Sequence, residues 1–176
     1  MKKLMTVLAM AAIAGSVQAA SFSWKTAATG KVYNPGTTDL LASATAYLFD
    51  ASAVSQSSLV TAFATGGLDL STMGSLSSKD ISNGAIASTT FSDSTPVGGT
   101  LNSYFAIIVS IDGKDYLFIS DATTASGQEG KTNTISFNAK AASQAGALDA
   151  SAGYSVGGWY AAVPEPTSGL LLLLGV

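Results

Sequence analysis

The chain has 176 residues, of which 47% are hydrophobic and only 11% are charged, with a formal net charge of −3. It contains no histidine or cysteine, so disulfides, thiolate nucleophiles, Cys/His zinc sites and Ser-His-Asp triads are excluded. Its basic residues are all lysines. Nucleic-acid binding depends on arginine and on basic patches and is therefore not expected.

The N-terminus has the parts of a secretory signal peptide. A basic start, Met1-Lys2-Lys3, is followed by an apolar segment over residues 4–14 and by Val17-Gln18-Ala19, which fits the small-x-small rule of signal peptidase. We predict that residues 1–19 direct the chain to the secretion translocon and that signal peptidase removes them by cleaving between Ala19 and Ala20. The alternative, an uncleaved anchor, is disfavoured because the apolar segment falls short of the ~20 residues that span a bilayer. Cleavage would leave the mature chain with a net charge near −5.

The first part of the mature chain predicts two strands and one helix. Apolar and polar residues alternate over 21–27 and again over 44–49, and Asn34-Pro35-Gly36 between them predicts a turn. From 52 to 65 the spacing becomes helical, with Gly66-Gly67 able to end the helix and Asp50 or Ser52 able to cap it. The apolar residues of this predicted helix are Val54, Leu59, Val60 and Phe63.

A β-hairpin is the strongest structural prediction, over residues 104–120. Two apolar runs flank Asp112-Gly113, a pair that supplies the positive φ angles of a type I′ turn. This turn predicts three cross-strand pairs: Val109 with Tyr116 and Ile107 with Phe118 on one face, and Ile108 with Leu117 on the other. Because both faces are apolar, the hairpin is expected in the middle of a sheet that is covered on both sides.

The other segments are patterned more weakly. Residues 68–83 are expected to form a loop with one short element, and 94–100 a connector. Strands are predicted over 85–91, 134–137 and 154–160, and residues 139–152 predict either a short helix or a loose excursion.

These elements predict one mostly β domain over residues 20–162. Six or seven strands separated by turn signals favour an antiparallel β-sandwich or flattened barrel with one short inserted helix. The signal helix precedes this domain and an apolar tail, residues 163–176, follows it.

Carboxylates are the first candidates for chemistry, because a glycosidase needs only two of them. Four aspartates stand where predicted strands end, but aspartate is favoured in turns for its own hydrogen bonds. We therefore predict no catalytic residues and keep a carboxylate-only glycosidase as the less favoured alternative. No D-x-D-x-D-G calcium loop occurs, and neither a metal site nor a cofactor is predicted. The four aspartates are Asp50, Asp112, Asp115 and Asp121.

Aromatic residues near the two ends of the domain suggest a second hypothesis, in which the domain binds sugars. Exposed rings could stack on sugars, which would make the domain a carbohydrate-binding module for extracellular polysaccharide. The competing and preferred interpretation is that the rings pack in the core, and burial of both tryptophans would count against the module. The residues concerned are Trp24, Tyr33, Trp159 and Tyr160.

The tail combines prolines with a leucine run. Val163, Pro164, Glu165 and Pro166 precede five leucines, residues 170–174; the prolines end any preceding strand, and the leucines are typical of the start of a membrane segment. The tail resembles the PEP-CTERM sorting signal of exported bacterial proteins: a Pro-Glu-Pro motif, a transmembrane helix and an Arg-rich cytoplasmic end. Here the motif is matched, together with the opening of the helix. We expect the helix and the Arg-rich end to lie beyond residue 176. The alternative is a proline-rich linker with an accidental apolar end.

The resemblance implies a route rather than an activity. It implies an exosortase, a membrane transpeptidase that recognises the motif while the C-terminal segment holds the protein transiently in the inner membrane. Cleavage near the motif then delivers the domain to the cell surface or the extracellular matrix of a cell that produces exopolysaccharide. We therefore expect a non-enzymatic, exported surface or extracellular-matrix protein.

Overall fold

A computed structural model describes residues 18–162. Most of the predicted signal peptide and the whole sorting tail lie outside this range. The described part is mostly β, as predicted, with eleven strands and two α-helices. No helix within it is long and apolar enough to cross a membrane.

The strands form two sheets, neither of which closes into a barrel in the described range. The small sheet has the order β5-β1-β9 and consists of β1 (Ala19–Thr26), β5 (Thr89–Pro96) and β9 (Thr132–Phe137).

The large sheet has the order β10-β11-β7-β6-β2-β3-β4, and β8 pairs with β6 outside this path. Its strands are β2 (Ser43–Asp50), β3 (Ser77–Ser82), β4 (Ala85–Ile86), β6 (Thr100–Ile111), β7 (Lys114–Ile119), β8 (Thr123–Ser126), β10 (Leu148–Asp149) and β11 (Gly158–Ala161).

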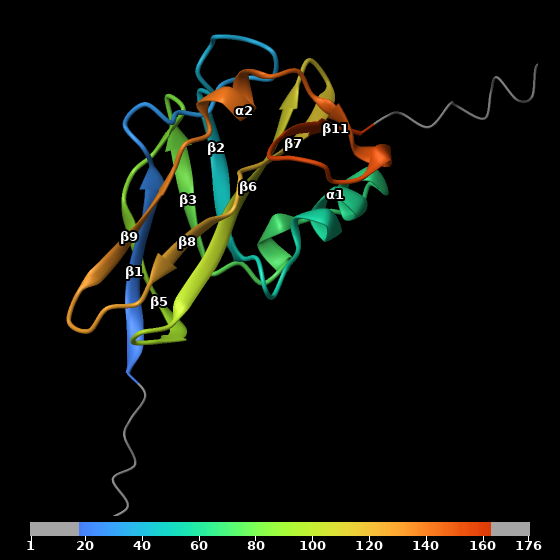
Figure 1. Cartoon of the computed structure of the whole chain (residues 1–176). Helices are drawn as coiled ribbons and strands as arrows, with labels where there is room; N and C mark the ends of the chain where they lie inside the picture. Colours follow the sequence, from blue (N-terminus) through green and yellow to red (C-terminus); the bar gives the residue numbers. More distant parts are fainter. Residues whose placement is uncertain (1–17, 163–176) are drawn as a thin grey trace, which may run out of the picture.

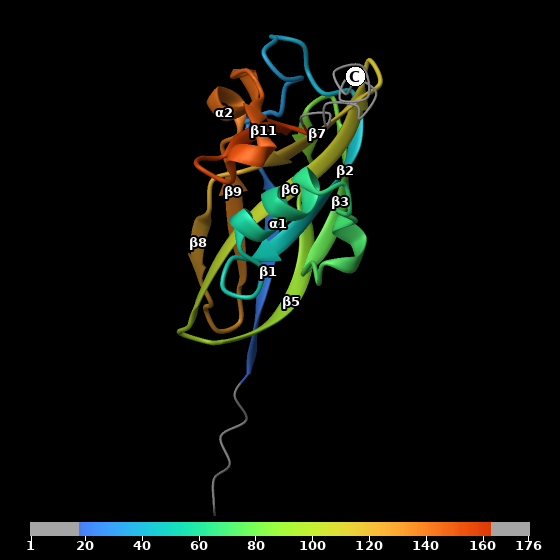
Figure 2. The same cartoon turned by 90° about the vertical axis from the view of Figure 1, so that its right-hand side faces the viewer.

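The large sheet is covered on both faces (Figures 1 and 2). The small sheet packs on one face, with Trp24 and Phe105 in the shared core. Helix α1 (Gln56–Ala64) packs on the other face, where Leu59 and Phe63 meet Tyr104. The two cores exist because successive side chains of β2, β6 and β7 point to opposite faces. Helix α2 (Lys140–Gln144) and the 3₁₀ turns η1 (Leu70–Thr72) and η2 (Ala150–Ala152) complete the fold.

The central hairpin is confirmed. Asp112 and Gly113 have φ angles of 52° and 74°, and β6 pairs with β7 in the predicted register, Val109 with Tyr116, Ile107 with Phe118 and Ile108 with Leu117. The hairpin lies in the middle of the large sheet, where its two apolar faces are both buried.

The expectation of purely antiparallel pairing was wrong. β1 pairs with β9 in parallel, and β10 pairs with β11 in parallel. Parallel neighbours need a long connection, and between β1 and β9 the chain builds most of the large sheet before it returns. Turn signals and local alternation carry no information about such a distant partner.

The helix was predicted in the right place but with the wrong cap. It begins at Gln56, and Ser55 caps it by accepting a hydrogen bond from the Ser58 N–H. Asp50 instead accepts hydrogen bonds from both the N–H and the hydroxyl of Ser52, at 2.8 Å each, which closes the turn before the helix. The chain leaves the helix through Gly66, at φ 74°.

Three further segments differ from the prediction. Residues 68–83, expected to form a loop with one short element, hold two, the turn η1 and strand β3. Five of the six residues of β3 are not buried, and the strand depends on pairing with β2. The strand expected over 85–91 is split into β4 and β5, since the chain passes there from the large sheet to the small one. The closing strand begins only at Gly158.

Candidate functional site

The sorting motif, Val163 to Pro166, follows directly on the described residues and lies outside them. β11 ends at Ala161, at a different end of the molecule from the start of β1 (Figure 1). The motif therefore begins within a few residues of the surface of the folded domain.

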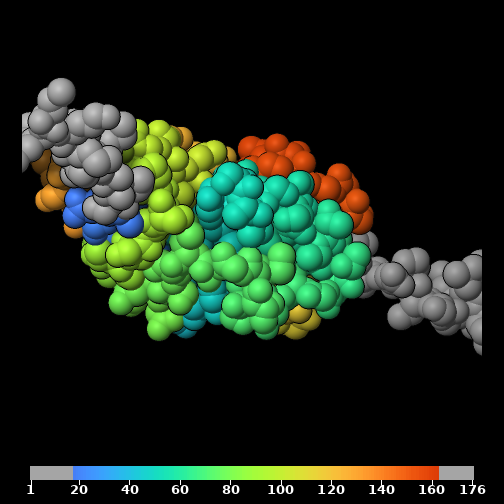
Figure 3. Space-filling model, turned by 90° about the horizontal axis from the view of Figure 1, so that it is seen from below, coloured from blue at the N-terminus to red at the C-terminus, as the bar shows by residue number. Residues whose placement is uncertain are grey.

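The predicted cleavage bond, Ala19–Ala20, lies within β1. Ala20 is 2% exposed, and the Gln18 carbonyl accepts a hydrogen bond from the Val97 N–H at 3.2 Å. The connections that follow β5 and β8 contribute Val97 and Gln128 to the same pocket wall as Gln18 and Ala19, and in Figure 3 the start of β1 (blue) lies beside yellow-green atoms. A protease that needs an extended, accessible chain can reach this bond only while β1 is unpaired.

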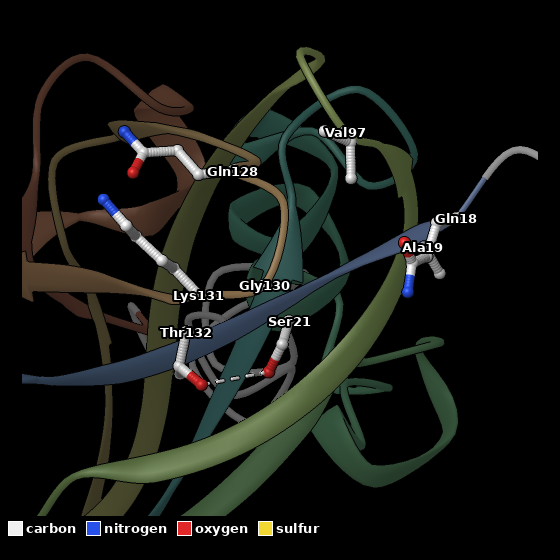
Figure 4. Close-up of a pocket in the computed structure, with 8 residues that line it drawn as sticks. All are labelled: Gln18, Ala19, Ser21, Val97, Gln128, Gly130, Lys131 and Thr132. Atoms are coloured by element: carbon white, nitrogen blue, oxygen red, sulfur yellow. Dashed lines mark hydrogen bonds between the residues drawn. The ribbon is translucent and has the colours of Figure 1, made fainter.

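A cavity of about 250 Å³ lies beside that bond (Figure 4). Ser21 of β1 and Thr132 of β9 lie side by side in its wall, with their hydroxyl oxygens 3.3 Å apart. Gln18 and Ala19 form part of its wall and belong to the predicted signal peptide. Signal cleavage would remove this wall, so the cavity is a poor candidate for a site of the mature protein.

An aromatic platform for sugars, the alternative interpretation, is not formed by these residues. Trp24, Trp159 and Tyr160 are fully buried, and the Trp159 ring packs edge-on against Phe118 at a centroid distance of 5.2 Å. Trp24 Nε1 donates to Ser77 Oγ at 3.1 Å. Core packing, the preferred interpretation, is confirmed for these three residues because buried rings have no face free for a sugar; only Tyr33 is partly exposed.

Two buried tyrosine hydroxyls hold loops in place. Tyr160 Oη donates to the Val156 carbonyl at 2.6 Å and accepts from the N–H groups of Ser155 and Val156, both at 3.2 Å. Tyr104 Oη donates to the Val54 carbonyl at 2.9 Å. Burial, and secondarily Tyr154, raise the pKa of Tyr104. This hydroxyl therefore remains a neutral donor at physiological pH.

Four of the acidic residues show turn chemistry. Asp50, Asp69 and Asp149 each accept two hydrogen bonds from the serine two residues further on, one from its N–H and one from its hydroxyl. Asp93 does the same with Thr95. The other predicted candidates, Asp112, Asp115 and Asp121, are exposed.

Hydrogen bonds from Ser71 and Ser151 lower the pKa of Asp69 and Asp149 respectively. No group of three or more potential metal-ligating side chains occurs among residues 18–162. Four of the aspartates therefore serve local turns.

A pocket that the sequence did not predict lies at the other end of the molecule, between residues 27–42 and α2. Its volume is about 400 Å³, and its wall includes Lys31, Tyr33 and Lys140; we call it the lysine pocket. A second cavity, of about 220 Å³, adjoins it and shares Thr29 and Lys140. Sequence reasoning missed the pocket because the two lysines are far apart in the chain and neither stands in a recognisable motif.

Hydrogen bonds from three directions fix the backbone around the lysine pocket. The Ala139 N–H donates to the Gly30 carbonyl at 3.2 Å, and the Gly36 N–H donates to the Ala145 carbonyl at 2.9 Å. Trp159 Nε1 donates to the Tyr33 carbonyl at 3.0 Å. The loop that carries Lys31 and Tyr33 is thus tied both to the start of α2 and to a core tryptophan.

Glycine is required where this loop meets β9. A Cβ at Gly30 would stand 2.6 Å from the Phe137 carbonyl oxygen and 2.8 Å from the Asn138 Cα. Since both atoms belong to the backbone, neither can move aside cheaply. Gly30 therefore allows the loop to approach close enough for Lys31 and Lys140 to share one pocket.

No protein family, curated protein or solved structure gives a match to this chain.

Proposed function

We propose that this chain is a non-enzymatic, exported surface or extracellular-matrix protein, sorted through the PEP-CTERM and exosortase route. The observation that carries the proposal is the pairing of two export signals around one folded domain. An N-terminal segment with the composition of a signal peptide precedes the domain, and Pro164-Glu165-Pro166 with a leucine run follows it.

The geometry of the domain is compatible with such handling. The Ala19–Ala20 bond lies inside β1, and Ala20 is buried, so cleavage by signal peptidase would take place during translocation, before β1 pairs with β5. The motif begins directly after β11, within about 15 Å of Ala162 along an extended chain. An exosortase would therefore act close to the surface of a folded domain, with the C-terminal segment in the inner membrane.

The composition is compatible with a structural role outside the cytoplasm. The chain has no cysteine, so its folding needs no disulfide formation in the envelope. Its large aromatic side chains fill two cores, and four of its aspartates close turns. A carbohydrate platform built from both tryptophans has no support, because their rings are buried.

The sorting motif is tested by replacing its prolines. In a host that contains an exosortase, the complete reading frame is expressed with Pro164 and Pro166 intact or changed to alanine, and the cells are fractionated. We expect the unchanged protein at the cell surface or in the matrix, and the variant retained in the inner membrane at higher mass. A variant of Thr167→Ala is the control and should be sorted normally. The same compartment and the same mass for all three proteins would contradict the proposal.

A further inference from the structure

The lysine pocket concentrates positive charge on an acidic protein. Residues 18–162 hold six lysines: Lys25, Lys31, Lys79, Lys114, Lys131 and Lys140. Two of these six line one pocket, and no acidic side chain lines it or the adjoining cavity. The wall itself therefore carries two positive charges, which favour a negatively charged ligand, although Asp39 stands between the lining residues Thr38 and Leu40.

The rest of the pocket wall is uncharged and partly apolar, with Ala28, Leu40 and one aromatic ring. Tyr33 is half-buried and contributes the ring, while Thr29 and Thr38 contribute hydroxyls. The adjoining cavity adds the amides of Asn138 and Gln144. Sites for small ligands combine a few placed polar groups with an aromatic or apolar wall in this way, and their volumes begin near ~300 Å³.

We propose that the lysine pocket binds carboxylate-bearing sugars of an acidic polysaccharide. The ammonium groups of Lys31 and Lys140 hold the sugar carboxylate through charge-assisted hydrogen bonds. The threonine hydroxyls and the two amides meet the sugar hydroxyls, and the Tyr33 ring covers the apolar face of one sugar. Because the two cavities share Thr29 and Lys140, a second sugar unit of the same chain would enter the adjoining cavity.

Other anions fit the pocket less well. A nucleic acid owes its affinity to many phosphate contacts, and this pocket offers two cations and no arginine. A free phosphate would use the lysines but would leave the amides and the Tyr33 ring without a role. The proposal is independent of the export route, since it concerns only what the folded domain binds.

The test is affinity electrophoresis of the exported protein, purified from cells that express the full chain. The gels contain polygalacturonate as the carboxylated probe, dextran as the neutral probe or polyphosphate as the non-sugar anion. We expect retardation by polygalacturonate alone, weakening as NaCl is raised from about 0.05 M to about 0.5 M because salt screens exposed charges. Two variants probe the pocket, Lys31→Ala with Lys140→Ala and, separately, Tyr33→Ala. Tyr33→Ala keeps the backbone carbonyl that Trp159 binds.

We expect both pocket variants to lose about tenfold or more in affinity, the equivalent of one or two hydrogen bonds to a charged group. The matched control, Lys79→Ala with Lys114→Ala, removes the same charge from strands β3 and β7 and should change affinity less than about twofold. Equal losses in the control and the lysine variant would overturn the proposal in favour of non-specific attraction. Retardation by polyphosphate that is insensitive to Tyr33→Ala would overturn the assignment of a sugar as the ligand. No retardation in any gel would overturn that assignment and also the proposal that the pocket binds anions.

Discussion

At the scale of single residues, several turns are closed by hydrogen bonds between carboxylate and hydroxyl groups. Four aspartates bind the serine or threonine two positions later, and two tyrosines anchor loops to the cores. No ionised side chain is needed inside either core, and no buried side-chain nitrogen or oxygen in the described range lacks a partner. Because short polar side chains close the turns and the cores hold no ionised group, the chain can be rich in small polar residues and poor in charged ones.

The Tyr160 hydroxyl should contribute measurable stability. It makes three hydrogen bonds to the backbone of the loop before β11, and Tyr160→Phe removes all of them. Because Ser155 and Val156 are exposed, water can replace part of the loss, and we expect a decrease of about 1–2 kcal/mol in the free energy of unfolding. Urea denaturation followed by tryptophan fluorescence measures it. Tyr47→Phe, in a half-buried tyrosine of β2, is the control and should change stability by less than about 0.5 kcal/mol.

Asp69 and Asp149 should make part of the stability dependent on pH. Their serine partners lower the pKa of each carboxyl. A carboxyl with a lower pKa in the folded chain contributes stability that is fully present above its unfolded pKa, about 4. That contribution is lost as the pH falls through the folded pKa.

The variant with Asp69→Asn and Asp149→Asn should therefore lose less stability between pH 7 and pH 3 than the unchanged protein. Urea denaturation at the two pH values gives the comparison. Asp112→Asn with Asp115→Asn is a control of equal charge at two exposed positions. If both double variants flattened the pH dependence to the same extent, general charge repulsion rather than the serine hydrogen bonds would be responsible.

At the scale of secondary-structure elements, the hairpin at the centre of the large sheet depends on its turn. Gly113 has a φ of 74°, which disfavours a residue with a Cβ. Gly113→Ala should lower the free energy of unfolding by about 1 kcal/mol. Gly146→Ala is the control: no atom lies within 4 Å of a Cβ there and its φ is not in the left-handed region, so that change should be neutral or slightly stabilising. A Gly113→Ala protein as stable as the control would show that the turn tolerates either residue.

Predictability from sequence followed the strength of local patterns. The hairpin was predicted to the level of individual pairs because a two-residue turn fixes the register of its strands. Strand β3 was missed because only Ile81 among its six residues is buried, and a mostly polar strand leaves no period-two pattern. The parallel pairing of β1 with β9 was missed because it depends on a partner far away in the chain.

The candidate site was predicted less well than the fold. Of the four aromatic residues singled out, three are in the cores, and only Tyr33 lines a pocket. Composition gives the number of tryptophans and tyrosines, while exposure depends on which face of which strand meets a second layer. The lysine pocket exists because Gly30 lets its loop approach β9, and a single glycine in a loop gives no warning of such a contact.

At the scale of the whole molecule, the domain has three layers, and its two ends lie far apart on it. The small sheet, the large sheet and α1 are stacked in that order, β1 begins at one end and β11 finishes elsewhere (Figure 1). Processing at the C-terminal end therefore need not disturb the cores, whereas cleavage before Ala20 reaches the edge of one of them. Removal of residues up to Ala19 takes away one residue of β1, and a cut near Pro164 to Pro166 leaves all eleven strands intact.

The most direct measurement of the central claim is the intact mass of the exported protein. It would be isolated from the cell surface or matrix of a host with an exosortase and compared with the protein from a host that lacks the enzyme. Two processed ends are expected only in the first host: an N-terminus at Ala20 and a C-terminus near Pro164 to Pro166, without the leucine run. A surface protein whose mass still includes the leucine run, or the same C-terminus in both hosts, would contradict sorting by this route.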